Sequence, residues 1–281
     1  MITRLFNFFL FSSLFIALCA VLMVHQSNHL LKLEYNSRPL LLFVFFSTLC
    51  SYNLHWWLTP FSSSEKIRSQ WTQEHRITHI ILTVIGAAGS FWFFLPFIEH
   101  WIWIAPCAIL TFLYSAPKLP FPVFLHLKKV AIGKTIFLSF VWMYVTTALP
   151  IFVSGKAWHE KELLFCCSRF LLIYAICILF DYRDRDQDKQ EGIRSMITYF
   201  SPKGVDYLFL TSLLLFAVST ILLIYCGVSM LVIVVLLIPG LLTALLYRTA
   251  KNNHSDYLYY FVLDGLMMLS APLLLLFKFA R

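Results

Sequence analysis

The sequence predicts an all-α integral membrane protein, a single domain over residues 1–281 built as a polytopic bundle of about nine transmembrane helices. Hydrophobic residues make up 60% of the chain and charged residues 13%, and the mean hydropathy is +0.77. Soluble domains carry about 25% charged residues. The hydrophobic residues also gather in runs long enough to cross a bilayer, which takes about 20 residues. These observations exclude an ordinary soluble protein.

We expect a transmembrane span wherever an apolar run lies between polar or proline-containing loops. The expected ranges are 5–24, 39–58, 77–98, 101–114, 131–153, 163–180, 205–226, 228–247 and 257–279. The first run follows Arg4 as a signal peptide would, but no small-residue cleavage site closes it, so we interpret it as a retained helix. The fourth run is short for a bilayer, and its separation from the third depends on a break at Glu99 and His100.

The basic residues indicate how the spans are oriented. The net charge is +8, but Lys and Arg are scattered among short loops, which argues against a nucleic-acid partner. With a cytoplasmic amino terminus, the cytoplasmic loops carry 15 Lys and Arg and the opposite side carries 6. The positive-inside rule therefore favours a cytoplasmic amino terminus and an external carboxy terminus. We expect the membrane to be the bacterial inner (cell) membrane.

The densest charge lies in residues 181–195, directly after the sixth apolar run. If the helix continues, Asp181, Asp184 and Asp188 fall at i, i+3 and i+7 and share one face. Three carboxylates on one stripe suit Mg²⁺, which commonly binds carboxylates together with a substrate's phosphates. The pattern therefore predicts a Mg²⁺ site for a diphosphate substrate. The alternative is a solvated helix end whose charges pair along the surface, for example Asp181 with Arg185.

This segment resembles the second aspartate-rich motif of the UbiA-type intramembrane prenyltransferases. Asp184 and Asp188 match its D-x-x-x-D pair, and residues 192–195 match the turn that follows. In that family, two aspartate motifs on facing helices hold Mg²⁺ and an isoprenoid diphosphate, and the prenyl chain passes to an aromatic or other lipophilic acceptor. The resemblance implies the same fold, with Asp184 and Asp188 as metal ligands and Asp181 as an auxiliary ligand.

The first aspartate motif, N-D-x-x-D-x-x-x-D, is degenerate at the end of the second run. Only Asn53 matches, and the expected aspartates align with Leu54, Trp57 and Phe61, none of which can bind Mg²⁺. Asn53 and His55 could still bond a diphosphate or its waters. Alternatively, they hydrogen-bond neighbouring helices.

Residues 113–120 resemble the family's Tyr-Ser-x-Pro segment, which lies over the diphosphate as a cap. Pro117 and the prolines after it prevent the helix from continuing, so Tyr114, Lys118 and Lys128 can fold over the site as donors to phosphate. The alternative is that these lysines are ordinary positive-inside anchors. The resemblance favours the functional interpretation.

The implied function is Mg²⁺-dependent transfer of a prenyl group from an isoprenoid diphosphate to a lipophilic, aromatic acceptor. Asp184, Asp188 and Lys118 are the candidate catalytic residues, and the candidate diphosphate-binding residues are Asn53, Tyr114, Lys118, Lys128 and Arg194. The degenerate first motif supports an alternative, a non-catalytic relative that binds an isoprenoid or lipid. A small transporter is a second alternative, for which the intramembrane Arg169 is suggestive. We expect Arg169 to point into the bundle and Asp264 to be a packing partner rather than a ligand.

Overall fold

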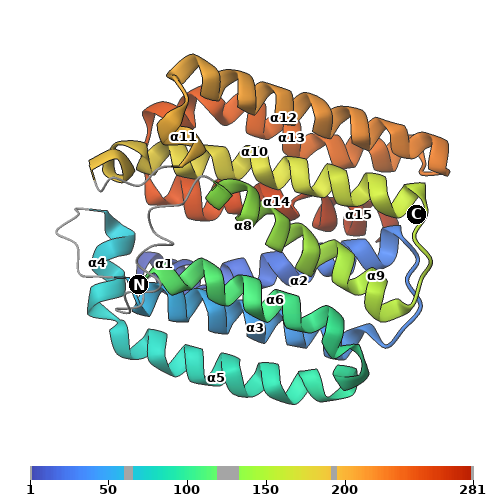
Figure 1. The fold of residues 1–281 in the computed structure, drawn as a ribbon, viewed down its shortest axis with the longest axis horizontal. Coiled ribbons are helices and arrows are strands. Elements are labelled where there is room, and N and C mark those ends of the chain that lie inside the picture. Colours follow the sequence, from blue (N-terminus) through green and yellow to red (C-terminus); the bar gives the residue numbers. More distant parts are fainter. Residues whose placement is uncertain (1, 60–65, 119–132, 191–194, 280–281) are drawn as a thin grey trace.

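The computed structural model describes residues 2–59, 66–118, 133–190 and 195–279. Within these residues every regular element is a helix, and the long helices lie side by side along the longest axis of the molecule (Figure 1). The all-α bundle expected from the sequence is therefore confirmed for the described chain.

Each expected apolar run forms one helix or several consecutive helices, and two short helices lie in polar loops. The elements in chain order are α1 (Ile2–Phe11), α2 (Leu14–Leu30), α3 (Ser37–Trp57), α4 (Ile67–Glu74), α5 (Arg76–Phe94), η1 (Leu95–His100), α6 (Trp101–Ser115), η2 (Ala116–Lys118), α8 (Lys134–Met143), η4 (Tyr144–Ala148), α9 (Leu149–Ser154), α10 (Glu160–Gln190), α11 (Met196–Tyr199), α12 (Pro202–Leu222), η5 (Leu223–Cys226), α13 (Met230–Asn252), η6 (Leu258–Leu263), α14 (Asp264–Met268) and α15 (Ser270–Phe279). The short loop helices are α4 and α11.

The described residues contain six helices that are long and apolar enough to cross a membrane. The number rises to eight if each of two bent pairs, α1 with α2 and η6–α14 with α15, is one span. The nine spans expected from the sequence are not confirmed by this count. The count takes Arg76–Ser115 as one span, although the chain reverses direction at η1 between α5 and α6 (Figure 1).

The first apolar run, expected as one helix, is bent by 59° between α1 and α2. The break lies at Ser12 and Ser13, and Ser13 has the left-handed backbone conformation with φ of 66°. The bend frees the Ser12 carbonyl from its helix, and the Asn53 side chain of α3 donates to that carbonyl at 3.0 Å. A tertiary hydrogen bond therefore supports a break that contains neither glycine nor proline.

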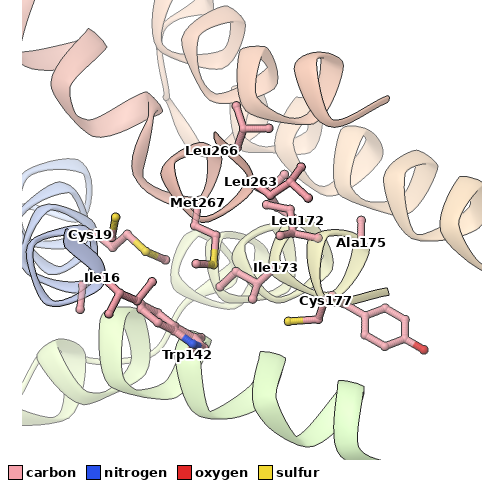
Figure 2. Close-up of a cluster of buried hydrophobic side chains, with 14 of the residues drawn as sticks. Ile16, Cys19, Trp142, Leu172, Ile173, Ala175, Cys177, Leu263, Leu266 and Met267 are labelled. Carbon is pink, nitrogen blue, oxygen red and sulfur yellow. The ribbon is translucent and has the colours of Figure 1, made fainter. Parts of the chain in front are cut away.

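The core is built around α10, the most deeply buried span. Its apolar side chains meet residues of α2, α8 and the η6–α14 segment in one cluster (Figure 2). The labelled residues of this cluster are Ile16, Cys19, Trp142, Leu172, Ile173, Ala175, Cys177, Leu263, Leu266 and Met267. This packing holds α10 within the bundle, and the acidic segment continues the same helix.

Helices α3 and α5 lie in close contact because α5 carries glycine where it faces α3. A Cβ atom at Gly86 would lie 2.6 Å from the backbone nitrogen of Cys50, so a side chain there would collide with α3. Small residues allow such close approach between membrane helices.

The segments with motif-like sequences gather at one end of the bundle. Figure 1 places α4, the end of α6, the start of α8, the end of α10 and α11 at this end, which we call the motif end. The start of α1 also lies there, whereas α15 ends at the opposite side (Figure 1). The expectation that the motif loops face one side is therefore met for the described residues.

Candidate functional site

A cavity of about 1680 Å³ runs into the bundle from the motif end. Its charged lining residues all lie at or near that end: Lys66, Arg68, Lys118, Lys134, Asp181, Arg183, Asp184, Asp188, Asp256 and Asp264. Farther along the helices the lining is largely apolar, with Phe43, Val44, Phe94, Ile104, Leu138, Val145 and Leu149. Ordinary ligand pockets measure about 300–1,000 Å³. This cavity therefore has room for a polar headgroup and a long hydrocarbon chain.

Helix α10 presents its three aspartates to the cavity, as the sequence predicted. The helix continues through the acidic segment to Gln190, and Asp181, Asp184 and Asp188 all line the cavity wall. Their i, i+3 and i+7 spacing accounts for the shared face.

Asp181 is held by the start of α8. Its carboxylate accepts a short hydrogen bond from the Thr135 hydroxyl, and it lies 3.7 Å from the Lys134 Nζ atom. Arg185 points elsewhere, because its guanidinium donates to the carbonyls of Ile197 and Phe200 at 3.0 and 2.9 Å. The alternative pairing of Asp181 with Arg185 is therefore wrong.

Asp184 lies between two cations. Its Oδ1 atom is 3.1 Å from Arg183 Nε and 3.2 Å from Lys66 Nζ. Arg183 also lies 3.6 Å from Asp256 and donates to the Tyr260 hydroxyl at 3.0 Å. Asp184 is thus part of a network that joins the end of α10 to the residues before α4 and to η6.

These ion pairs bear on the expected Mg²⁺ site. Asp181 and Asp184 each already face a cation where a divalent ion would need open carboxylate oxygens. The described part of the chain contains no group of three or more His, Cys, Asp or Glu side chains placed to hold a metal ion. Lysines and an arginine thus lie beside two of the three expected ligands, and the Mg²⁺ site of Asp181, Asp184 and Asp188 stays a prediction.

Lys118 and Tyr114, two candidate diphosphate donors, both contact His55 near the end of α3. Lys118 Nζ donates to His55 Nε2 at 2.7 Å, to the His55 carbonyl at 3.3 Å and to the Thr59 hydroxyl at 2.5 Å. Tyr114 stacks on the His55 ring with 5.2 Å between centroids. Burial, and after it the nearby charges of Lys134 and Arg68, lower the pKa of Lys118 to about 7.

Asn53, an expected diphosphate ligand, is not among the residues that line the cavity. It is fully buried, and its amide donates to the Ser12 and Leu49 carbonyls at 3.0 and 2.8 Å. Its Oδ1 atom lies 2.7 Å from His79 Nδ1. The structure favours the other interpretation, in which Asn53 joins neighbouring helices.

Two further candidates, Lys128 and Arg194, lie outside the described residues. Arg169 points into the bundle as expected, but it does not line the cavity. Its guanidinium donates to Gln26 at 2.8 Å and to the Met267 carbonyl at 3.4 Å, so it serves helix packing.

Sequence reasoning missed Arg68, which lies in α4. Only 3% of its surface is exposed, and its guanidinium lies 4.1 Å from the centroid of the Trp56 ring. Its Nε atom has no hydrogen-bond partner among the described residues. Burial lowers the pKa of Arg68 to about 10, while Tyr260, Asp256 and Asp264 act in the opposite direction. Nothing in the sequence of this short polar loop indicates that one of its arginines is buried.

Sequence reasoning also underrated Asp264. We expected a packing partner, but the carboxylate lines the cavity and forms no hydrogen bond or ion pair with any residue that the structure describes. The sequence did indicate a functional role for Asp264, because carboxylates within membrane spans are rare and mark functional sites.

The comparisons with known proteins agree with this geometry. The model of the UbiA prenyltransferase family matches residues 72–267, a range that includes the acidic segment of α10 and excludes α3. The apo structure of a UbiA homolog from Aeropyrum pernix K1 superposes with a TM-score of 0.69 over 94% of this chain and 98% of that chain, at 13% sequence identity. At this identity the likeness shows the fold alone. No curated protein sequence matches the chain. The apolar helices and the family match together indicate an integral membrane protein, and the chain belongs to the UbiA prenyltransferase family.

Proposed function

We propose that this protein binds an isoprenoid diphosphate in the cavity and transfers the prenyl group to a lipophilic, aromatic acceptor within the bilayer. The observation that carries the proposal is the change in character along one cavity. Cations gather at the motif end, and the wall beyond them is largely apolar. Such a gradient suits a ligand with an anionic head and a hydrocarbon tail.

The diphosphate head would lie among Lys66, Lys118 and Lys134, which line the motif end of the cavity together with Tyr114. Ammonium and phenol groups donate strong, charge-assisted hydrogen bonds to phosphate oxygens. Negative charge grows on the diphosphate as its bond to the prenyl C1 atom breaks. Cations already in position stabilise that charge without reorganisation.

The prenyl chain would follow the apolar wall. Tyr52 and Trp142 line the wall near the charged end, and the Trp142 indole N–H donates to the Tyr52 hydroxyl at 3.1 Å. Aromatic faces stabilise a nearby cation electrostatically, and an apolar chamber keeps water from an allylic carbocation.

Asp264 is our candidate for the proton acceptor. In the transfer, the C1–oxygen bond breaks and its electron pair leaves with the diphosphate. An electron pair of the acceptor forms the new bond to C1, and the proton that the acceptor loses passes to the Asp264 carboxylate. A carboxylate that lines the cavity without a described partner is available for this proton.

The family resemblance implies Mg²⁺, with the α10 aspartates as its ligands. Since Asp181 and Asp184 pair with lysines, we assign the stabilisation of the departing diphosphate to the cations of the cavity. Asp184, Asp188 and Lys118, the candidate catalytic residues from the sequence, all line this cavity.

The main alternative is a non-catalytic relative that binds an isoprenoid or another lipid anion in the same cavity. Leu54 and Trp57, which stand where the family carries aspartates, favour it. The transporter alternative loses its motivation, because Arg169 is engaged in helix packing.

Purified protein in lipid nanodiscs tests these proposals. Farnesyl or geranylgeranyl diphosphate is added with phenolic acceptors, and both diphosphate release and prenylated product are measured. Acceptor-dependent release supports the transferase, and Lys118→Gln should reduce it. Tight binding without release supports the non-catalytic relative. Absence of both binding and release would overturn the proposed function.

A further inference from the structure

We infer that two cations of the protein, Lys118 and Arg68, hold the diphosphate at the end of α3, so that its binding requires no divalent metal ion. The inference rests on the proposed function and specifies how its headgroup is recognised. It concerns the place where the family's first aspartate motif would lie.

The end of α3 has lost its metal-binding side chains. Leu54 and Trp57 occupy two positions aligned with aspartates, and both line the cavity. Neither side chain can bind Mg²⁺. Any positive charge facing the diphosphate from α3 must therefore come from another element.

Lys118 supplies one such charge. Its ammonium is anchored to His55 in the last turn of α3 and to Thr59 just beyond that helix. All its hydrogen-bond partners are neutral groups, and it forms no ion pair with a carboxylate of the described chain. Its charge therefore has no anionic partner in the described cavity.

Arg68 of α4 supplies the second charge, beside the same Trp56 ring. Its guanidinium carbon lies 4.1 Å and Lys118 Nζ lies 5.6 Å from the centroid of the same indole ring. The guanidinium makes one long hydrogen bond, 3.4 Å to the Leu10 carbonyl, and its Nε atom has no partner among the described residues. Asp256 accepts a hydrogen bond from the backbone N–H of Arg68 at 2.8 Å, and this bond does not involve the guanidinium.

Arg68 is a buried cation whose Nε atom has no partner among the described residues, and the half-buried Lys118 ammonium donates to neutral groups, so both raise the free energy of the empty cavity. A diphosphate relieves this cost, because its oxygens accept from the ammonium and bind a guanidinium in a bidentate fashion. Two single positive charges also replace the charge of one divalent ion. On the facing wall, Lys134 and Lys66 already neutralise Asp181 and Asp184, so a metal ion would have to displace them.

The experiment titrates farnesyl diphosphate into the full-length protein in nanodiscs, with excess EDTA in one series and excess Mg²⁺ in the other. We expect dissociation constants that agree within about threefold between the two series. In EDTA, Lys118→Gln and Arg68→Gln should each weaken binding by about tenfold or more, as expected for lost charge-assisted hydrogen bonds. Arg185→Gln is the matched control, since this arginine lies at the same end but does not line the cavity, and it should leave affinity unchanged.

The outcomes separate the inference from the proposed function. Binding only with Mg²⁺ would overturn the inference and leave the proposed function standing. Binding in EDTA that neither substitution weakens would overturn the assignment to these two residues. Absence of binding in both series would overturn the proposed function itself. Because Arg68 is buried among aromatic rings, Arg68→Lys and a thermal-unfolding measurement distinguish lost recognition from lost folding.

Discussion

Lys118 Nζ lies 2.7 Å from His55 Nε2, so this half-buried lysine donates to a neutral imidazole that directly follows Leu54 in the sequence. Its environment favours the uncharged amine, and the pKa of Lys118 is lowered to about 7. The charge of Lys118 therefore changes in the range in which membrane enzymes are assayed.

The first prediction concerns the pH dependence of ligand binding. Below about pH 7 Lys118 is mostly charged, and above it mostly neutral. A bound diphosphate stabilises the charged form and raises the pKa, so binding takes up protons and affinity falls as pH rises from 6 to 8, by up to about tenfold. Calorimetry in buffers of different ionisation enthalpy measures the proton uptake. Lys118→Arg, which stays charged, should remove this part of the uptake, and equal uptake in both proteins would contradict the prediction.

The second prediction concerns Asn53. Asn53→Leu removes the donor to the Ser12 carbonyl and leaves buried polar groups unpaired, including His79. We expect a loss of about 1–3 kcal/mol in the free energy of unfolding. The dissociation constant for farnesyl diphosphate should not change in the protein that remains folded. Thermal unfolding and ligand titration on the same sample check both statements, and weaker binding at unchanged stability would place Asn53 back in the site.

The third prediction concerns Asp184. Asp184→Asn removes a negative charge that pairs with Lys66 at the cavity. In EDTA, diphosphate affinity should therefore stay the same or rise by a few-fold, because the local potential becomes more positive. Asp186→Asn, at an exposed position of the same helix, is the control. A loss of binding by Asp184→Asn that is confined to Mg²⁺-containing buffer would instead identify Asp184 as a metal ligand.

The fourth prediction concerns Asp264. If its carboxylate accepts the proton of the prenyl acceptor, Asp264→Asn should lower the rate of product formation by about 10²- to 10⁴-fold. Binding of the diphosphate should change by less than about threefold. Single-turnover product formation and equilibrium binding measure the two effects. Normal turnover in the variant would exclude the proposed role.

The fifth prediction concerns orientation. The charge asymmetry of 15 to 6 Lys and Arg favours a cytoplasmic motif end. The end of α15 lies on the opposite side of the bundle from the start of α1 (Figure 1). A reporter fused at the carboxy terminus should therefore be external. Activity of a cytoplasmic reporter at that point would invert the assignment.

Prediction from the sequence succeeds where all the residues of a pattern lie on one helix. The shared face of Asp181, Asp184 and Asp188 depends only on the helical period and on the continuation of α10, and both hold. The bend at Ser13 could not be predicted in this way, because it contains no helix-breaking residue and is supported by Asn53 from another helix. Local pattern carries no information about such a distant partner.

The site shows the same division. Lys118 was predictable from the proline that ends its helix and from the family segment around it. Arg68 was not, because its burial depends on α4 lying against aromatic rings of three other elements, Phe11, Trp56 and Tyr260. The pairs of Asp181 with Lys134 and of Asp184 with Lys66 were hidden for the same reason, since both lysines come from segments distant in sequence.

The contact of Lys118 with the end of α3 has a consequence for exchanging segments between members of the family. Placing aspartates at Leu54 and Trp57 would set new carboxylates beside an ammonium that is already anchored to His55 and Thr59. Those aspartates would pair with Lys118 before any metal ion could reach them, so restoring the motif and removing the lysine act together and not additively. The α3 segment and the residues after α6 therefore form one epistatic unit. A chimera that replaces only one of them would recognise the diphosphate as neither parent does.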